Sequence, residues 1–266
     1  MSLRTLLERG RPILLDGGLS TALEELGADL NDPLWTARVL RDDPDLVLAA
    51  HRSFVAAGAE IVISASYQAP DELLAESVRI ARYAGVPVAA SVGPYGAVLG
   101  GGQEYSGDYE VPEGWHERRL ALLLSAAPDF VAIETQPRVD EAVSIVRLLE
   151  GIDCWVTFTC RDGERTWHGE PIEEAVSAVA AFEAVAAVGV NCTAPEYVDE
   201  LLSRARSVTE LPLVAYPNAG RRYDAATKTW SGAAKPPSFA GAQLVGGCCG
   251  IGPSGIRALA SANTSR

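Results

Sequence analysis

The chain has 266 residues, 48% of them hydrophobic and 21% charged, which is typical of a globular protein long enough for one large domain. Its formal net charge of −13 would repel a phosphate backbone, so nucleic acid is not an expected partner. No run approaches the roughly 18 apolar residues of a membrane span, and the first residues lack the apolar segment of a signal peptide. We therefore expect a cytoplasmic protein without membrane contact.

Eight short apolar runs recur along the chain, each ending in polar or turn-forming residues. Continuous apolar runs of this length are typical of strands buried on both faces of a parallel sheet. The runs cover residues 12–18, 59–68, 86–96, 129–137, 153–163, 185–194, 211–220 and 242–250.

Segments with helical spacing of apolar residues lie between most of these runs, and several begin at proline and end at glycine, as helices do. They cover residues 43–58, 70–85, 112–127, 137–151, 171–185 and 195–208, with a short last helix from Pro253. Residues 219–240 are polar and rich in glycine and proline, and we expect a long loop there.

Strands that alternate with helices in one continuous chain predict an α/β fold, a (β/α)8 TIM-type barrel formed as a single domain by residues 1–266. The alternative is an open doubly wound sheet. It is disfavoured because the first predicted strand is followed by GGLST and not by a G-x-G-x-x-G motif.

Three of the five cysteines lie at predicted strand ends, where such barrels gather their chemistry. Cys192 lies near the end of the sixth run, and Cys248 and Cys249 lie near the end of the eighth. These strands are two apart in a closed barrel, so their tips can converge, and glycines at 246, 247 and 250 would let the backbone turn. Three thiolates suit Zn²⁺ and leave a fourth position open. The alternative is that all three are small buried hydrophobic residues.

Two motifs around these cysteines, GVNC (189–192) and GGCCG (246–250), resemble the homocysteine S-methyltransferase family. Five further segments resemble the S-methylmethionine-type branch of this family. They are LLDGGLSTALEELGADLNDPLWTARVL (14–40), AGAEIVISASYQA (57–69), SVGPYGA (91–97), IET (133–135) and YPNAGRRYDAATKTW (216–230). The resemblance extends over nearly the whole chain in the same order. Between Gln68 and Ser91 this chain is shorter than is common in that branch.

The resemblance implies a methyltransferase of methionine biosynthesis. Its Zn²⁺ would be held by Cys192, Cys248 and Cys249. It would transfer a methyl group from a sulfonium donor, S-methylmethionine or S-adenosylmethionine, to the homocysteine thiol. Both donors are left open, as is the use of selenium analogues.

Carboxylates at the first and fourth strand tips could hold the ammonium group of homocysteine by charge-assisted hydrogen bonds. The resemblance gives this role to Asp16 and Glu134, and to backbone amides such as that of Gly17. From the residues alone, Asp16 could equally cap a helix, and Glu134 could be a solvated loop carboxylate. Asn191 is expected either to orient the site through its amide or to form a plain turn.

Aromatic faces attract sulfonium cations, which makes Tyr67 and Trp35 candidates for the donor site. The alternative for Trp35 is an ordinary core or surface aromatic residue. The histidines at 51, 116 and 168 lie away from strand tips and are expected to be structural or solvated, and Cys154 and Cys160 to be structural.

Other functions remain as alternatives. A betaine-type homocysteine methyltransferase would carry a long C-terminal extension, whereas this chain stops at Arg266. A non-catalytic zinc-binding barrel would need a fourth ligand, and no further cysteine or histidine stands at a strand tip. A barrel metal hydrolase would surround its metal with histidines and carboxylates. The expected partners are small-molecule substrates, and the expected assembly is a monomer or small homo-oligomer.

Overall fold

The computed structural model describes residues 2–32, 34–220, 222–224, 229–231, 239 and 241–263. Eight parallel strands form its main sheet. They are β1 (Ile13–Leu14), β2 (Val62–Ile63), β3 (Val88–Val92), β4 (Phe130–Gln136), β5 (Cys154–Phe158), β6 (Val185–Asn191), β7 (Leu213–Tyr216) and β10 (Leu244–Val245). Each lies within one of the eight apolar runs, so all eight predicted strands are confirmed.

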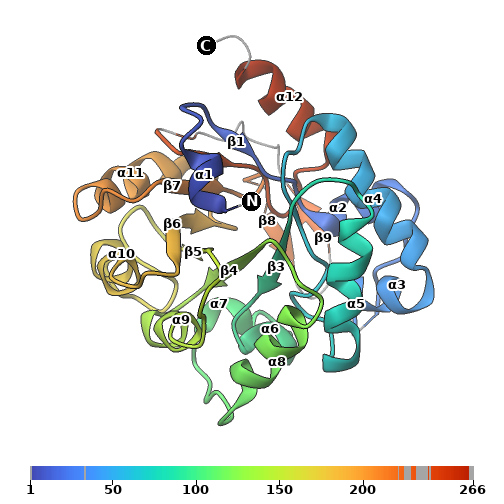
Figure 1. Cartoon of the computed structure of the whole chain (residues 1–266), viewed down its shortest axis with the longest axis horizontal. Helices are drawn as coiled ribbons and strands as arrows, with labels where there is room; N and C mark the ends of the chain where they lie inside the picture. The colour runs from blue at the N-terminus through green and yellow to red at the C-terminus, as the bar shows by residue number, and fades with distance from the viewer. Residues whose placement is uncertain are drawn as a thin grey trace.

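The sheet curls into a barrel. Its strand order is β1-β10-β7-β6-β5-β4-β3-β2, and a parallel bridge between Leu15 and Ile61 joins the two edges. Figure 1 shows the strands arranged around a centre with the helices outside them. This confirms the predicted α/β fold of the TIM type.

The predicted helices are also confirmed. They are α4 (Pro44–Ala57), α5 (Asp71–Arg82), α8 (Trp115–Leu124), α9 (Val139–Val146), α10 (Ile172–Ala180), α11 (Pro195–Arg206) and α12 (Pro253–Asn263). In α4 the signals read from the sequence act as expected, because Asp43 accepts a hydrogen bond from the amide of Leu46 and Gly58 ends the helix with a φ of 114°.

The structure also contains short helices outside the predicted helical segments. One of them, α2 (Leu19–Glu25), lies where a helix after Asp16 was considered. The others were not predicted, and they are α1 (Leu3–Leu7), α3 (Thr36–Asp42), α6 (Gly96–Leu99) and α7 (Gln103–Ser106). None of the described helices has both the length and the apolar character needed to cross a membrane.

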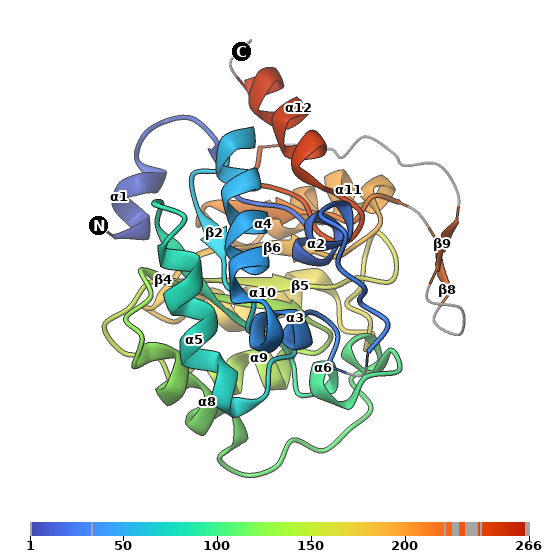
Figure 2. The ribbon, with the colours of Figure 1, turned by 90° about the vertical axis from the view of Figure 1, so that its right-hand side faces the viewer.

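Residues 219–240, predicted as a long loop, contain an antiparallel pair of strands, β8 (Arg222–Asp224) and β9 (Thr229–Ser231). The prediction missed this pair because each strand has only three residues, although strand-favouring residues occur in both, an aromatic one in RYD and a β-branched and an aromatic one in TWS. The rest of the predicted loop lies partly outside the described residues. Figure 2 shows β8 and β9 at the opposite end of the molecule from α1.

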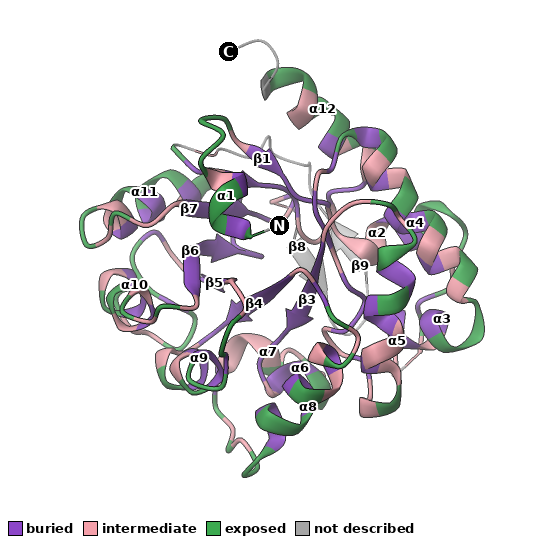
Figure 3. Ribbon diagram, in the orientation of Figure 1, coloured by how far each residue is buried: buried purple, intermediate pink, exposed green. Residues whose placement is uncertain are grey.

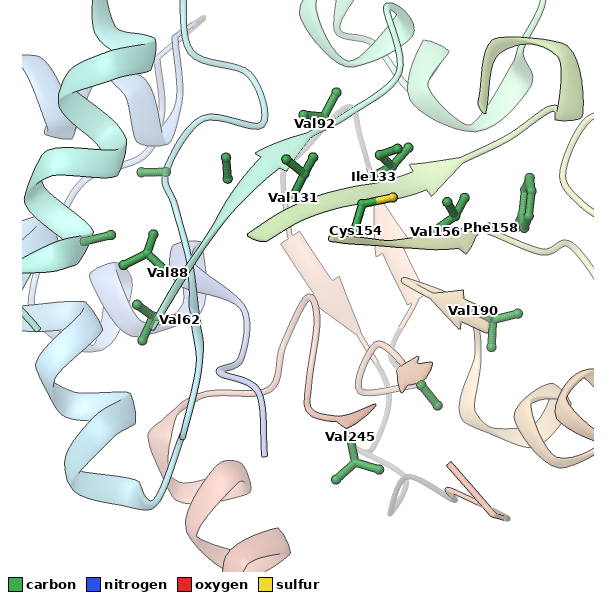
Figure 4. Close-up of a cluster of buried hydrophobic side chains, with 14 of the residues drawn as sticks. Val62, Val88, Val92, Val131, Ile133, Cys154, Val156, Phe158, Val190 and Val245 are labelled. Carbon is green, nitrogen blue, oxygen red and sulfur yellow. The ribbon is translucent and has the colours of Figure 1, made fainter. Parts of the chain in front are cut away.

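Strand residues alternate between two hydrophobic cores. In β4, Phe130 and Ala132 belong to a cluster inside the barrel, whereas Val131 and Ile133 belong to a larger cluster between strands and helices. Figure 4 shows part of this outer layer, built mainly from valine side chains, and Figure 3 shows buried residues along the strands and on the inward faces of the helices. By the same alternation Glu134 points into the barrel, at the carboxyl end of its strand.

The N-terminal helix α1 closes the end of the barrel that lies opposite the carboxyl ends of the strands. Leu3 and Leu6 are buried and join the inner cluster, and Figure 1 shows α1 across the end of the barrel that faces the viewer. The amide of Leu3 also donates to a carboxylate oxygen of Asp153, which precedes β5, at 2.8 Å. The carboxyl ends of the strands are therefore left as the open face.

Candidate metal centre and substrate pocket

A pocket at the carboxyl ends of the strands contains every residue that the sequence placed in the site except Asn191. Its walls include Asp16, Gly17, Trp35, Tyr67, Glu104, Tyr105, Glu134, Thr135, Cys192, Tyr216, Cys248 and Cys249. Among the described residues that line the pocket there is no lysine, arginine or histidine. An acidic and aromatic pocket of this kind favours cationic ligands.

The three predicted cysteines converge in this pocket. The Sγ atoms of Cys192 and Cys249 lie 3.6 Å apart, and the Sγ atoms of all three cysteines lie within 4.8 Å of one another. Cys192 follows β6 and the pair follows β10, with only β7 between these strands. Such a set of soft ligands fits a thiophilic divalent metal ion and leaves room for a further ligand.

Hydrogen bonds divide the cysteines into one acidic thiol and two donors. The thiols of Cys248 and Cys249 lower the pKa of Cys192 well below its usual value, while donation to Cys192 raises the pKa of Cys248 and of Cys249. The hydroxyl of Tyr105 also lies 3.4 Å from the Sγ of Cys192. Among the three neighbouring thiols, these hydrogen bonds favour Cys192 as the site of negative charge.

The glycines beside the cysteine pair act in two ways. Gly250 turns the chain with a φ of 80°, as predicted. Gly246 and Gly247 have no such φ, and for them the structure gives a different reason for glycine. A Cβ on Gly246 would lie 2.7 Å from the carbonyl oxygen of Asp16, and one on Gly247 would lie 2.3 Å from the Ile251 side chain. These two positions require glycine because backbone and side chains approach closely.

Asp16 is buried at the end of β1 and does not cap a helix. Its Oδ2 accepts a hydrogen bond from the amide of Ile63 at 2.9 Å, and α2 begins after Gly18 without a side-chain cap. Burial raises the pKa of Asp16 well above its usual value. Gly17 lines the pocket beside it, and a Cβ there would lie 2.4 Å from the carbonyl oxygen of Ile251.

Glu134 is buried inside the barrel mouth, so it is not a solvated loop carboxylate. The hydroxyl of Ser91 donates to its Oε1. Burial raises the pKa of Glu134 to about 7, against hydrogen bonds from Ser91 and Tyr216 that lower it. A carboxyl group with this pKa can change its charge near neutral pH.

Asn191 acts at the base of the site by joining two strands. Its Oδ1 accepts from the amide of Thr135 at 2.7 Å, and its Nδ2 donates to the Oγ1 of Thr135 at 2.8 Å. Thr135 sits where the register between β4 and β5 shifts. The side-chain amide thus holds the backbone that follows Glu134 next to the backbone that precedes Cys192. This fits the expected orienting role better than a plain turn.

Trp35 and Tyr67, the predicted donor-site aromatics, both line the pocket. The ring of Tyr67 packs so closely on Gly93 that a Cβ there would lie 2.6 Å from it, and burial raises the pKa of Tyr67 well above its usual value. Trp35 precedes α3 with a φ of 49°. Both aromatic residues therefore occupy positions suited to contact with a bound ligand.

Glu104 and Tyr105 line the pocket but were not predicted. They lie on α7, within the segment 93–114 that joins β3 to α8. The signal in the sequence was the length of this connection, since long segments after barrel strands are commonly functional. Burial raises the pKa of Glu104, as does the nearby Cys192, against backbone amides at Gly102 and Glu104 that lower it.

The other cysteines and the histidines lie outside the pocket. Cys154 and Cys160 are buried, and burial raises the pKa of Cys154 to about 12. His51 is buried on α4, and burial lowers its pKa to about 4. His116 lies 2.9 Å from a carboxylate oxygen of Glu141.

Together the fold and the site define a barrel protein with a three-thiol centre in an acidic pocket at the carboxyl ends of its strands. A family model described as homocysteine S-methyltransferase matches residues 13–263. The chain belongs to the homocysteine S-methyltransferase family.

Relatives match along most of their length. The chain is 40% identical to homocysteine S-methyltransferase 4 of Zea mays, over 96% of this chain and 90% of that protein. It is 38% identical to the homocysteine S-methyltransferase of Escherichia coli, over 97% of each. The crystal structure of the metallated form of the homocysteine methyltransferase MmuM from Escherichia coli superposes with a TM-score of 0.85 at 36% identity, covering 98% of this chain and 99% of that one.

These alignments also bear on chain length. The alignment with the maize relative extends over 308 positions, more than the 266 residues of this chain. The relative therefore carries inserted residues that this chain lacks. Between Gln68 and Ser91, where shortening was predicted, the structure has α5 as its one helix before β3 begins.

Proposed function

We propose that this protein transfers a methyl group from a sulfonium donor to the thiol of homocysteine, forming methionine, with Zn²⁺ held by Cys192, Cys248 and Cys249. The observation that carries the proposal is the convergence of these three thiols inside an acidic pocket. Membership of the homocysteine S-methyltransferase family supports the acceptor, and the metallated form of the Escherichia coli relative supports a metal.

The three cysteines suit zinc chemically. A bound Zn²⁺ would lower the pKa of the homocysteine thiol so that it reacts as a thiolate. Three cysteine thiolates around a dication leave a formal charge of −1, which keeps an added sulfur ligand electron-rich. The hydrogen bonds that lower the pKa of Cys192 favour the deprotonated form that a metal ligand requires.

Asp16 and Glu134 would hold the homocysteine ammonium group. Both carboxyl groups are buried and line the same pocket, and the charge of Glu134 adds to the effect of burial in raising the pKa of Asp16. A cation between two neighbouring carboxylates relieves their repulsion and provides charge-assisted hydrogen bonds. Gly17 would contribute its backbone to the same side of the pocket.

The donor would be a cation because of the charge on these walls. Carboxylates at Asp16, Glu104 and Glu134 and the aromatic rings of Trp35 and Tyr67 face one space. In the reaction, the homocysteine thiolate attacks the methyl carbon and the bond from that carbon to the donor sulfur breaks. The electron pair of the broken bond returns to the donor sulfur and cancels its charge. The chain contributes by holding the two sulfur atoms and the methyl group in line.

Substitution of the cysteines tests the metal. Cys192→Ser and Cys248→Ser are each expected to lose bound zinc and to lower homocysteine methylation at least about 100-fold, since each removes a ligand of the only predicted metal. Zinc per chain and methionine formed are the two measurements. Cys154→Ala, which changes a buried cysteine outside the pocket, serves as the control. Full zinc and full activity in Cys248→Ser would refute the assignment.

A screen of methyl donors tests the proposal that the donor is a sulfonium compound. S-methylmethionine, S-adenosylmethionine and betaine are each supplied with homocysteine, and methionine is measured. Activity with a sulfonium compound and none with betaine is the expected result. Activity with betaine alone would instead favour the betaine-type alternative.

A further inference from the structure

One carboxylate in the pocket has an oxygen without a hydrogen-bond partner. The Oε2 atom of Glu104 is buried, and the described residues provide it with none. Leaving a buried carboxylate oxygen unpaired is costly, so such atoms in native proteins generally receive a partner. Because Glu104 lines the pocket, a ligand bound there can supply that partner.

Among the described residues, the other two carboxylates in the pocket have no such buried unpaired oxygen. Asp16 accepts from the amide of Ile63, and Glu134 accepts from the hydroxyl of Ser91. Asp16 and Glu134 lie at strand ends in the barrel mouth, after β1 and in β4, whereas Glu104 lies on α7 in the connection between β3 and α8. Carboxylates therefore line the pocket from two kinds of element, with Asp16 and Glu134 at the strand ends and Glu104 on the helix.

The unpaired Oε2 of Glu104 is a hydrogen-bond acceptor, so the chemical group of the ligand that pairs with it must be a hydrogen-bond donor. A sulfonium has no hydrogen to donate, and neither does a quaternary ammonium, whereas a primary ammonium group donates three hydrogen bonds. A charge-assisted bond from such a group would satisfy Glu104. The proposed function places the ammonium group of homocysteine at Asp16 and Glu134. An ammonium group bound by Glu104 must therefore belong to the second substrate, the methyl donor.

We propose that Glu104 binds the ammonium group of the methyl donor, which makes the donor a sulfonium compound that is also an amino acid. This inference rests on the proposed function and goes beyond it by assigning a residue to donor selection. Tyr105, next to Glu104, reaches the metal cysteines through its hydroxyl at 3.4 Å from the Sγ of Cys192. An ammonium group at Glu104 therefore lies beside the place where the methyl group must be delivered.

The segment that carries Glu104 is fixed at both ends by one buried carboxylate. Glu141 on α9 accepts from the amide of Tyr95 at 2.6 Å and from the hydroxyl of Tyr109 at 2.8 Å. It also pairs with His116 on α8 at 2.9 Å. These bonds fix both sides of α7, so Glu104 is held in place before the donor arrives.

Substitution of Glu104 by its uncharged isostere tests the assignment in the zinc-loaded full chain. Glu104→Gln is expected to raise the KM for S-methylmethionine about 10- to 100-fold, the loss typical of a hydrogen bond to a charged group. The dissociation constant of homocysteine and the zinc content should stay unchanged. A second comparison uses S-methylmethionine and its analogue without the amino group. The native chain should prefer the amino compound at least 10-fold in kcat/KM, and Glu104→Gln should abolish most of this preference.

Glu110→Gln is the matched control, because Glu110 is an exposed carboxylate on the same segment, and its kinetic constants should match those of the native chain. An unchanged KM for S-methylmethionine in Glu104→Gln would overturn the inference, as would equal use of the two donors by the native chain. Weaker homocysteine binding would instead place Glu104 in the acceptor site, and loss of zinc would make it a metal ligand, so either also overturns it. If the native chain uses no sulfonium donor, the proposed function itself fails, and that result is separate from these.

Discussion

Three residues in the pocket have backbone conformations that residues other than glycine rarely adopt. Trp35, Thr135 and Cys192 have φ values of 49°, 56° and 47°, and all three line the pocket. Such conformations cost about 1–3 kcal/mol each and persist where the surrounding structure holds them. At Thr135 the restraint is visible, because the side chain of Asn191 bonds both its amide and its hydroxyl.

Glu134 makes the stability of the chain depend on pH in a defined window. Its pKa of about 7 in the folded chain compares with an ordinary value of 4.5. Between these values the unfolded carboxyl group is ionised while the folded one keeps its proton, so the folded state binds more protons. Rising pH therefore lowers the free energy of unfolding through this window, and the loss is complete above pH 7.

Glu134→Gln should remove this dependence. The free energy of unfolding of the variant, measured by urea titration of the metal-free chain, should rise relative to the native chain between pH 4.5 and 7. The expected gain is up to about 3 kcal/mol, from the size of the pKa difference. Glu110→Gln, at an exposed carboxylate, should give a flat difference. Parallel stability curves for Glu134→Gln and the native chain would show that this carboxyl group ionises normally.

The sequence predicted those residues of the site that lie at the ends of strands. Asp16, Glu134, Asn191 and the cysteines could be predicted because they lie at the polar ends of apolar runs, and the order of strands in a barrel brings these ends together. Glu104 and Tyr105 could not, because no periodic pattern relates a position within the connection 93–114 to the barrel axis. Their approach to the cysteines depends on tertiary contacts, such as those of Glu141, that the sequence alone does not specify.

The elements that form the fold differ in how clearly the sequence marks them. Long amphipathic helices and fully apolar strands carry their own periodicity. Helices such as α1, α6 and α7, with five residues or four, are too short to show a repeat. Elements of this size owe their conformation to packing rather than to intrinsic propensity.

Helix α1 illustrates an element whose contribution is stability alone. Leu3 is fully buried against the inner cluster of the barrel, at the end away from the pocket. Leu3→Ala should lower the free energy of unfolding by about 2–5 kcal/mol, the usual cost of such a truncation in a core. Zinc content and the KM of both substrates should not change.

The comparison for this variant is Arg9→Ala, an exposed position just after α1, for which a loss below about 1 kcal/mol is expected because surface ion pairs contribute little. Urea unfolding gives the stability, and methionine formation gives the kinetics. A rise in either KM for Leu3→Ala without loss of stability would mean that α1 communicates with the pocket.

On the scale of the whole molecule, the charge of the chain and that of its pocket have the same sign. The chain carries 35 acidic residues against 22 lysines and arginines, and the described walls of the pocket hold carboxylates without a basic side chain. A field of this kind raises the local concentration of cations and is screened by salt over about 10 Å at 0.1 M ionic strength. The two proposed substrates differ in net charge near neutral pH, since S-methylmethionine carries +1 and homocysteine carries none.

The salt dependence of the reaction should therefore differ between the substrates. Raising potassium chloride from about 20 to about 500 mM is expected to lower kcat/KM for S-methylmethionine about two- to ten-fold, because screening weakens the attraction of the cation. The value for homocysteine, measured at a saturating donor concentration, should change less than two-fold and serves as the internal control. Equal losses for both substrates would mean that salt acts on the protein or its metal site, and no loss for the donor would mean that local contacts such as that of Glu104 supply all of the donor's attraction.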